Sequence, residues 1–301
     1  MNAILAALMG QCWALDPLVM ERLTSVILRW SDGVRLSADQ IAAAVGGAPQ
    51  AASDRRNSAQ AVSGSVAVIP LYGVLAHRAH MVQSVSGPGG TSTEMFGRAL
   101  SAAVADPAVD AILIDVESPG GSVHGTQELA DRIFAARGQK PIVAIANATA
   151  ASAAYWIASA ADQVVATPSA LVGSIGVITA HEDKSAALAA EGRKITYITA
   201  GKYKAEGNAA EPLTDEARAE AQRMVDQFYG VMVKSIARGR GVAPEVVRGQ
   251  FGQGRVLSSS DALAAGMIDR IETFDEAVAR LQNPRRRSRM NTNAIRLAEA
   301  S

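Results

Sequence analysis

The sequence of 301 residues contains one cysteine, Cys12, which excludes a disulfide within the chain and is typical of a reducing compartment. It also has no excess of charge, because 29 Lys and Arg balance 29 Asp and Glu. The chain therefore has no overall electrostatic attraction to nucleic acid or to an anionic membrane. The four histidines are scattered, and no Cys/His cluster has metal-ligand spacing. We predict no metal, no cofactor and no nucleic-acid partner.

Long hydrophobic runs are also missing. The most apolar stretch, "MNAILAALMGQCWALDPLVM", is interrupted by Asp16-Pro17, well short of the ~20 residues that a membrane span needs. No membrane span is therefore expected. What is present is a chain with 49% hydrophobic and 19% charged residues, enough for one large or two modest globular units with a substantial core.

The order of patterns along the chain predicts four parts. Residues 1–46 form a helical N-terminal extension, because the apolar residues of "PLVMERLTSVILRW" keep helical spacing and Ser37 is a candidate N-cap for a second helix. Residues 47–64 are small, polar and aperiodic, as in a linker. Residues 65–282 form the main domain. Residues 283–301, with four arginines between 285 and 289, read as a basic flexible tail.

The main domain alternates strand and helix patterns. Short β-rich runs include "VAVIPLYGVL", "DAILIDVES", "KPIVAIANA", "DQVVATP", "LVGSIGVITA" and "KITYIT". Helical stretches such as "TSTEMFGRALSAAVA" and "GTQELADRIFAARG" lie between several of them, and a long amphipathic helix opens at Thr214 and stops near Gly239. Alternation of this kind predicts an α/β fold with parallel strands covered by helices.

Three segments of the main domain carry polar residues where chemistry could occur. "DVESPGGSVHG" (115–125) runs from a strand into two glycines, whose N–H groups could hold an oxyanion, although an ordinary tight turn explains it equally well. Ser152 follows a strand at the start of an Ala-rich helix, where a buried structural hydroxyl is the simpler interpretation. Lys204 in "GKYKAEGNAAEP", considered by itself, is predicted to be a surface lysine. A lysine that acts as a base must instead be kept neutral by desolvation, which lowers its pKa.

Together these segments resemble a known family. "SPGGSV", "AASAAYWIASAADQVVATPSALVGSIGVI" and "GKYKAE" are similar, in order and spacing, to motifs of the signal peptide peptidase A family of serine–lysine peptidases. The resemblance runs from about Val66 to Ala277 and includes "GRVLSSSDALAAGMIDRI". It implies the Clp-protease/crotonase-like α/β superfold, a polypeptide substrate and a homo-oligomer, with no cofactor or metal.

The resemblance also implies roles for individual residues. Ser152 aligns with the nucleophile, Lys204 with the general base, and Ser174 of "GSIG" with the hydroxyl that orients the lysine amine. The oxyanion hole would use the N–H groups of Gly121 and Ala153, and substrate would contact Gly120 and Ser122. Each role suits the chemistry, since a neutral amine beside a hydroxyl and two N–H donors are what acyl transfer requires.

This sequence differs from the family motif at the residues directly after Ser152, the aligned nucleophile. Family members often have glycines there, whereas this chain has Ala153 and Ala154, so the close packing that glycine permits is placed in doubt. The "SAAYW" variant and the segment "CWALDPLVMERLTSVIL" look more like phage and prophage members that process capsid or scaffold proteins. This branch implies a location in the cytoplasm of a bacterial host cell or within a phage procapsid.

Four other interpretations of the sequence differ in the residues that they require. A Ser-His-Asp triad needs a histidine at Ser152, but His181 would lie roughly 20 Å from Ser174 along a straight strand, and only one of the two can reach that serine. His124 is expected to face solvent. A crotonase-type acyl-coenzyme A enzyme would not require Ser152 or Lys204. A membrane-associated signal-peptide-degrading peptidase and a non-enzymatic capsid assembly protein are the remaining alternatives.

Overall fold

The computed structural model describes residues 12–31, 61–63, 65–78 and 90–283. The second predicted helix of the N-terminal extension, most of the predicted linker and the basic tail lie outside these residues. The linker segment ends in a short strand, β2 (Ala61–Ser63), which pairs with β3 (Val66–Tyr72) in antiparallel orientation.

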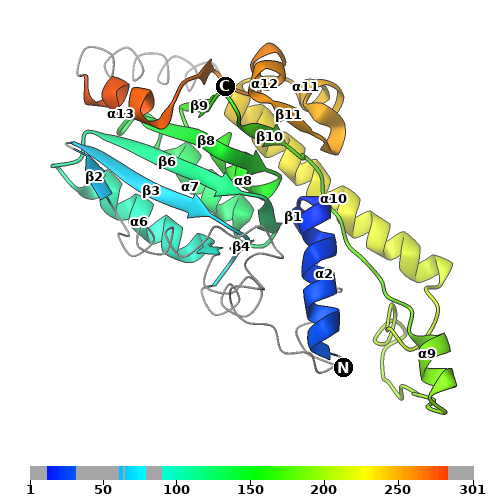
Figure 1. The fold of residues 1–301 in the computed structure, drawn as a ribbon. Coiled ribbons are helices and arrows are strands. Elements are labelled where there is room, and N and C mark those ends of the chain that lie inside the picture. The colour runs from blue at the N-terminus through cyan, green and yellow to red at the C-terminus, as the bar shows by residue number, and fades with distance from the viewer. Residues whose placement is uncertain (1–11, 32–60, 64, 79–89, 284–301) are drawn as a thin grey trace.

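The core of the molecule is an eight-stranded, mostly parallel sheet (Figure 1). β3, β6 (Ala111–Ser118), β8 (Ile142–Ala151) and β10 (Leu171–Gly173) follow one another in parallel across it. β9 (Gln163–Ala166) pairs with the first half of β8 and with β12 (Arg270–Ile271), and β11 (Val256–Ser258) pairs with β10 in antiparallel orientation. The α/β class with parallel strands is thus confirmed.

Helices cover both faces of this sheet, because its central strands are apolar on both sides. Along β6, Ile112 and Ile114 face the core beneath α6 (Thr93–Ala105), α7 (Thr126–Ala136) and α8 (Ala153–Ala158). The alternate residues Ala111 and Leu113 face α13 (Phe274–Gln282). Because successive residues of a strand face opposite sides of the sheet, alternate residues of β6 pack into two separate hydrophobic cores.

A second, four-stranded sheet stands at the carboxyl end of β6. Its order is β1 (Trp13–Leu15), β7 (Gly120–Ser122), β4 (Leu75–Ala76) and β5 (Thr91–Ser92). In the described part of the N-terminal segment, which was predicted as helical, residues 13–15 form a strand and the helix α2 spans Pro17–Ser31. The carboxylate of Asp16 accepts from Leu18 N–H at 3.0 Å, and proline fits the first helical turn, so the helix starts here.

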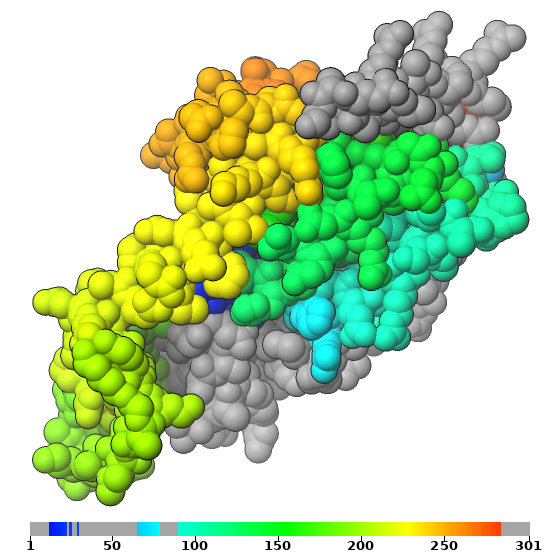
Figure 2. Space-filling model, turned by 180° about the vertical axis from the view of Figure 1, so that it is seen from behind, coloured from blue at the N-terminus to red at the C-terminus, as the bar shows by residue number. Residues whose placement is uncertain are grey.

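Residues 179–213, with α9 (Ser185–Ala190), form an arm that projects from the core together with the amino-terminal half of α10 (Asp215–Arg240) (Figures 1 and 2). As predicted, Thr214 caps α10 by accepting from Ala217 N–H, and Gly241 ends it in the left-handed conformation. The prediction of a strand at "KITYIT" (194–199) is wrong. Its residues are exposed, and a strand cannot form there without a pairing partner.

The carboxyl-terminal part continues beyond α10 with α11 (Pro244–Gln250), a short 3₁₀ turn (Gly252–Gly254), β11, α12 (Ser259–Ala264), β12 and α13. This order of a helix, a strand and a last helix after residue 254 agrees with the sequence pattern. Across the described ranges, the structure contains no helix with the length and apolar character of a membrane span.

Candidate active site

Ser152 lies at the sharp turn where β8 ends and α8 begins. Its backbone has φ 55° and ψ −117°, a region that non-glycine residues rarely occupy and that costs roughly 1–3 kcal/mol. Two hydrogen bonds hold this conformation: Ser152 N–H donates to Gly173 O at 2.7 Å, and Trp156 N–H donates to Ser152 O at 2.9 Å. A strained serine on a strand-to-helix turn is how several hydrolases present a nucleophile.

Ser174 lies beside Ser152 because β10 pairs in parallel with β8, with Gly173 opposite Ala151. Ser174 also has a positive φ, 52°, and is held by its N–H, which donates to Arg255 O at 2.8 Å. In the described ranges, these two serines are two of three non-glycine residues with positive φ. Both serines are buried, and backbone strain of this kind concentrates at functional sites.

The glycine turn predicted as an oxyanion cradle lies against the same serine. Gly120 has φ +103°, and a Cβ built on it would meet Ser152 Cβ at 3.0 Å and Ala151 O at 3.1 Å. A Cβ on Gly121 would lie 2.1 Å from Leu75 O. Both glycines are therefore required by close backbone approach, which an ordinary tight turn would not demand.

The surroundings of this turn differ from the prediction in one respect. The two glycines are the first residues of strand β7 (Gly120–Ser122), and α7 begins only at Thr126, so the glycines are not at a helix N-terminus. Ser122, predicted to contact substrate, is buried and its hydroxyl accepts from His124 N–H at 3.2 Å. Ser118, which sequence reasoning missed, orients the turn: its hydroxyl donates to Gly73 O at 2.6 Å and accepts from Gly120 N–H at 3.2 Å.

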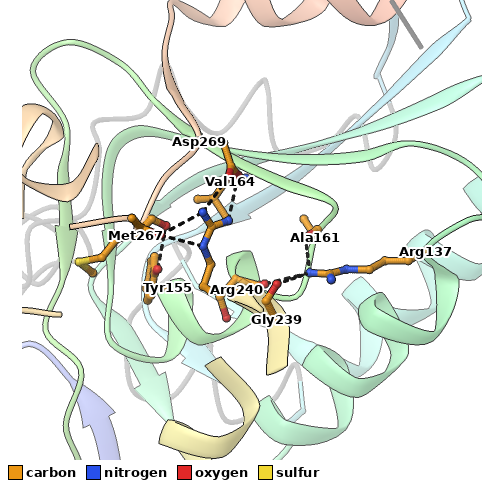
Figure 3. A network of polar contacts seen from close by, with 10 residues as sticks. Arg137, Tyr155, Ala161, Val164, Gly239, Arg240, Met267 and Asp269 are labelled. Carbon is orange, nitrogen blue, oxygen red and sulfur yellow. Dashed lines mark hydrogen bonds and ion pairs between the residues drawn. The ribbon is translucent and has the colours of Figure 1, made fainter. Parts of the chain in front are cut away.

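Helix α8 is anchored by a polar network at its far end (Figure 3). Tyr155 donates its hydroxyl to Met267 O at 2.8 Å, and burial raises the pKa of that phenol. Arg137 donates to Ala160 O at 2.9 Å and to Gly239 O at 2.8 Å, which ties the end of α8 to α10. Burial lowers the pKa of Arg137 to about 10, so its guanidinium remains charged at neutral pH.

This anchor predicts a large stability effect at Arg137. Arg137→Met leaves several carbonyls without their donor, and we expect it to lower the free energy of unfolding by about 2–4 kcal/mol. Arg238→Met is a matched control, because both guanidinium groups stack on Phe134 and Arg238 makes a surface ion pair with Asp131. Its expected loss is below about 1 kcal/mol. Urea unfolding measures both variants, and equal losses would contradict the anchoring role.

Lys204, the predicted base, lies on the arm and its side chain is exposed, whereas Ser152 is fully buried. Among the described residues, no hydrogen bond or ion pair joins the two, and the arm runs away from α8 (Figure 1). The described chain thus brings together Ser152, Ser174, Gly120, Gly121 and Ala153, but it leaves Lys204 apart from them.

The neighbouring Lys202 is differently placed. Its ammonium donates to Tyr203 Oη and to Glu216 Oε1, both at 2.9 Å. These two hydrogen bonds raise the pKa of Lys202, which keeps the amine protonated and unsuited to accept a proton. In the described ranges, the Lys204 amine makes no such bond, so Lys204 is the lysine of "GKYK" that is free to act elsewhere.

Among the residues that the structure describes, no hydrogen bond joins a histidine to Ser152. His181 lies on the arm, with Nε2 3.1 Å from Asn208 O. His124 is exposed, as expected, and its ring packs edge-on against Phe228 at 5.7 Å between centroids.

The chain is similar to known proteins over most of its length. A family model described as peptidase family S49 matches residues 135–287, which include Ser152, Ser174 and Lys204. Capsid assembly protease C of Escherichia phage lambda is 35% identical over 217 residues, covering 72% of this chain and 48% of that protein.

Two further relatives show the same pattern. Head-tail preconnector protein GP5 of Enterobacteria phage P21 is 33% identical over 218 residues, covering 72% of this chain and 43% of that protein. Protease 4 of Salmonella typhi is 30% identical over 218 residues, covering 72% of this chain and 34% of that protein. The chain thus spans less than half the length of these relatives. The family inferred from the three motifs is confirmed: the chain belongs to peptidase family S49, a family of serine peptidases.

Proposed function

We propose that this chain is a serine endopeptidase in which Ser152 is the nucleophile and Lys204 the general base. The observation that carries the proposal is the strained Ser152 on its strand-to-helix turn, directly beside the glycine turn and Ser174. The parallel sheet with helices on both faces fits the Clp-protease/crotonase-like superfold expected for this family.

The reaction follows from these positions. A neutral Lys204 amine takes the proton of Ser152 Oγ as that oxygen attacks the scissile carbonyl, and the N–H groups of Gly121 and Ala153 stabilise the oxyanion. The C–N bond then breaks, the lysine returns its proton to the leaving amine, and Ser152 carries the acyl group. Water, deprotonated by the same amine, hydrolyses the ester, while the Ser174 hydroxyl orients the lysine.

Because one chain keeps Lys204 away from Ser152, we propose that a second copy supplies the lysine. The arm carries four large exposed apolar residues within ten residues of Lys204 in the sequence: Ile195, Tyr197, Ile198 and Tyr203. Ile198 is 97% exposed. Exposed apolar residues clustered in this way mark an interaction surface. Docking of the arm over Ser152 of a neighbouring copy would bury them and bring the amine into a dry site.

Mixing two inactive variants tests this arrangement. Ser152→Ala and Lys204→Ala should each be inactive alone, because each lacks one half of the dyad. After the two variants are unfolded and refolded together, about one quarter of the sites should contain both residues if heterologous contacts mix at random. We therefore expect recovery of about a quarter of wild-type peptide hydrolysis, measured with a fluorogenic peptide library.

Lys194→Ala is the control for a general effect of removing charge from the arm, since Lys194 is also exposed there. It should keep full activity. Hydrolysis by the Lys204→Ala variant alone at neutral pH would remove Lys204 from the mechanism. No recovery in co-refolded oligomers, in the presence of active wild-type controls, would show that the dyad does not form between copies.

The proposed substrate is a capsid or scaffold protein, processed in a bacterial host cell or within a procapsid. This part of the proposal is supported by the two phage relatives, one of which is named a capsid assembly protease. Intact-mass analysis of such proteins after incubation with wild type or with Ser152→Ala would reveal fragments that require the nucleophile.

A further inference from the structure

Strand β1 lies in the path that an extended peptide would take. On one side it pairs with β7 in antiparallel orientation, with Ala14 opposite Gly121 and Leu15 opposite Gly120. On the other side Trp13 N–H donates to Ile178 O and Ile178 N–H donates to Trp13 O, both at 2.8 Å. β1 is therefore an inserted strand that uses the hydrogen-bonding edges of two different segments.

Both of these segments belong to the site around Ser152. β7 is the strand that contains the glycine turn, and Ile178 lies two residues after Gly176, whose carbonyl is 3.4 Å from Ser152 Oγ. A Cβ on Gly120 would lie 2.3 Å from Ala14 O and 3.0 Å from Ser152 Cβ. The backbone of β1 and the nucleophile therefore flank the same glycine.

Strand β1 is buried in the groove between β7 and the segment around Ile178. Its three residues and the preceding Cys12 are each 3% exposed or less. The contact continues at Asp16, whose N–H donates to Pro119 O at 3.0 Å. Recognition of an extended peptide by strand addition needs free backbone groups at a sheet edge, and here those groups already have partners.

We propose that β1 is a built-in occupant of the peptide groove, which keeps the site latent until residues 12–16 are displaced. This inference rests on the proposed function, because it takes the groove beside Ser152 as the place where substrate binds. Displacement has a defined extent: helix α2 begins at Pro17, so only the extended segment before it has to leave.

Cys12 provides a reporter for displacement, because it is the single cysteine of the sequence and is buried next to β1. Burial raises the pKa of the Cys12 thiol, and alkylation requires the thiolate, so iodoacetamide should react slowly with the resting protein. The probe for the groove is a labelled synthetic peptide of residues 10–17 with Cys12→Ser, which cannot react itself. The full-length protein carries Ser152→Ala, so that nothing is cleaved.

We expect saturating peptide to accelerate alkylation of Cys12 at least tenfold. Ala14→Pro should do the same without peptide, since proline removes a backbone donor from the middle of a sheet, whereas Ala14→Gly keeps that donor and should change the rate less than threefold. The labelled peptide should bind Ala14→Pro at least tenfold more tightly than it binds Ala14→Gly, measured by fluorescence anisotropy. With Ser152 restored, Ala14→Pro should raise kcat/KM for peptide hydrolysis at least tenfold.

Trp13→Ala replaces Ala14→Pro if the proline variant does not fold, because it weakens β1 by removing a buried indole while keeping the N–H group. Peptide that binds without accelerating alkylation would overturn the inference, as would equal affinity for the Ala14→Pro and Ala14→Gly variants. Alkylation in the Ser152→Ala background needs no catalysis. Failure of the proposed peptidase function would therefore show itself separately, as absent hydrolysis in every variant with Ser152 intact.

Discussion

Replacing Ser152 by alanine is expected to reduce peptide hydrolysis by at least ~10⁴-fold while leaving the fold intact. The loss is large because, in the proposed mechanism, Ser152 forms the acyl-enzyme. Stability should change little, since among the described residues the hydroxyl makes one long hydrogen bond, of 3.4 Å to Gly176 O, and alanine experiences the same backbone strain. The measurements are kcat/KM with a fluorogenic peptide and the thermal unfolding midpoint.

Two other serines serve as controls for this experiment. Ser159→Ala changes a buried serine at the end of the same helix, whose hydroxyl donates to Trp156 O at 2.7 Å, and activity should be retained. Ser174→Ala should lower kcat by about 10²-fold without abolishing it, because in the proposed mechanism its hydroxyl orients the base and does not attack substrate. If Ser174→Ala were the inactive variant and Ser152→Ala the active one, the two roles would have to be exchanged.

The second large effect is expected at Gly120. Gly120→Ala places a side chain at φ +103°, with its Cβ 3.1 Å from Ala151 O and 3.0 Å from Ser152 Cβ. These contacts remain when β1 leaves the groove, so the turn itself must move and carry the adjacent Gly121 N–H away from the oxyanion. Loss of one oxyanion donor typically lowers turnover by ~10²–10³-fold, and we expect kcat to fall in this range with KM changed less than threefold.

Gly266→Ala is the matched control for backbone strain. Gly266 has φ +77°, but no atom lies within 4 Å of a Cβ built there. Gly266→Ala should lose about 1 kcal/mol of stability, since it forces a side chain into the left-handed region. Gly120→Ala should lose more, because its Cβ would also lie 2.3 Å from Ala14 O. Only the change at Gly120 should lower kcat, and an equal kcat for the two variants would argue against an oxyanion hole at this turn.

Much of the site could be predicted from sequence because it is local. Ser152 and Ser174 each follow a strand pattern, and carboxyl ends of neighbouring parallel strands meet at one edge of a sheet. The glycine pair follows β6, the strand on the other side of β8, so the same rule places it nearby. Strand and helix periodicity predicted these elements with few exceptions.

The exceptions share a physical cause. "KITYIT" has strand composition but no strand, and Trp13–Leu15 is a strand within a segment with helical spacing. Whether a short segment becomes a strand depends on a partner edge, which no window of local sequence contains. β7 and Ile178 offer such an edge to residues 13–15.

The sequence alone determined the family and the α/β class, because these depend on motifs and on periodicity within short windows. The same motifs predict the residues of the proposed catalytic group. The tertiary structure decided which distant segments of the chain contact each other. It buried Ser152 beneath the chain's own N-terminal strand and left Lys204 on an exposed arm. Contacts between distant segments depend on which edges and apolar surfaces remain unpaired once the core has formed, and this becomes known only from the fold.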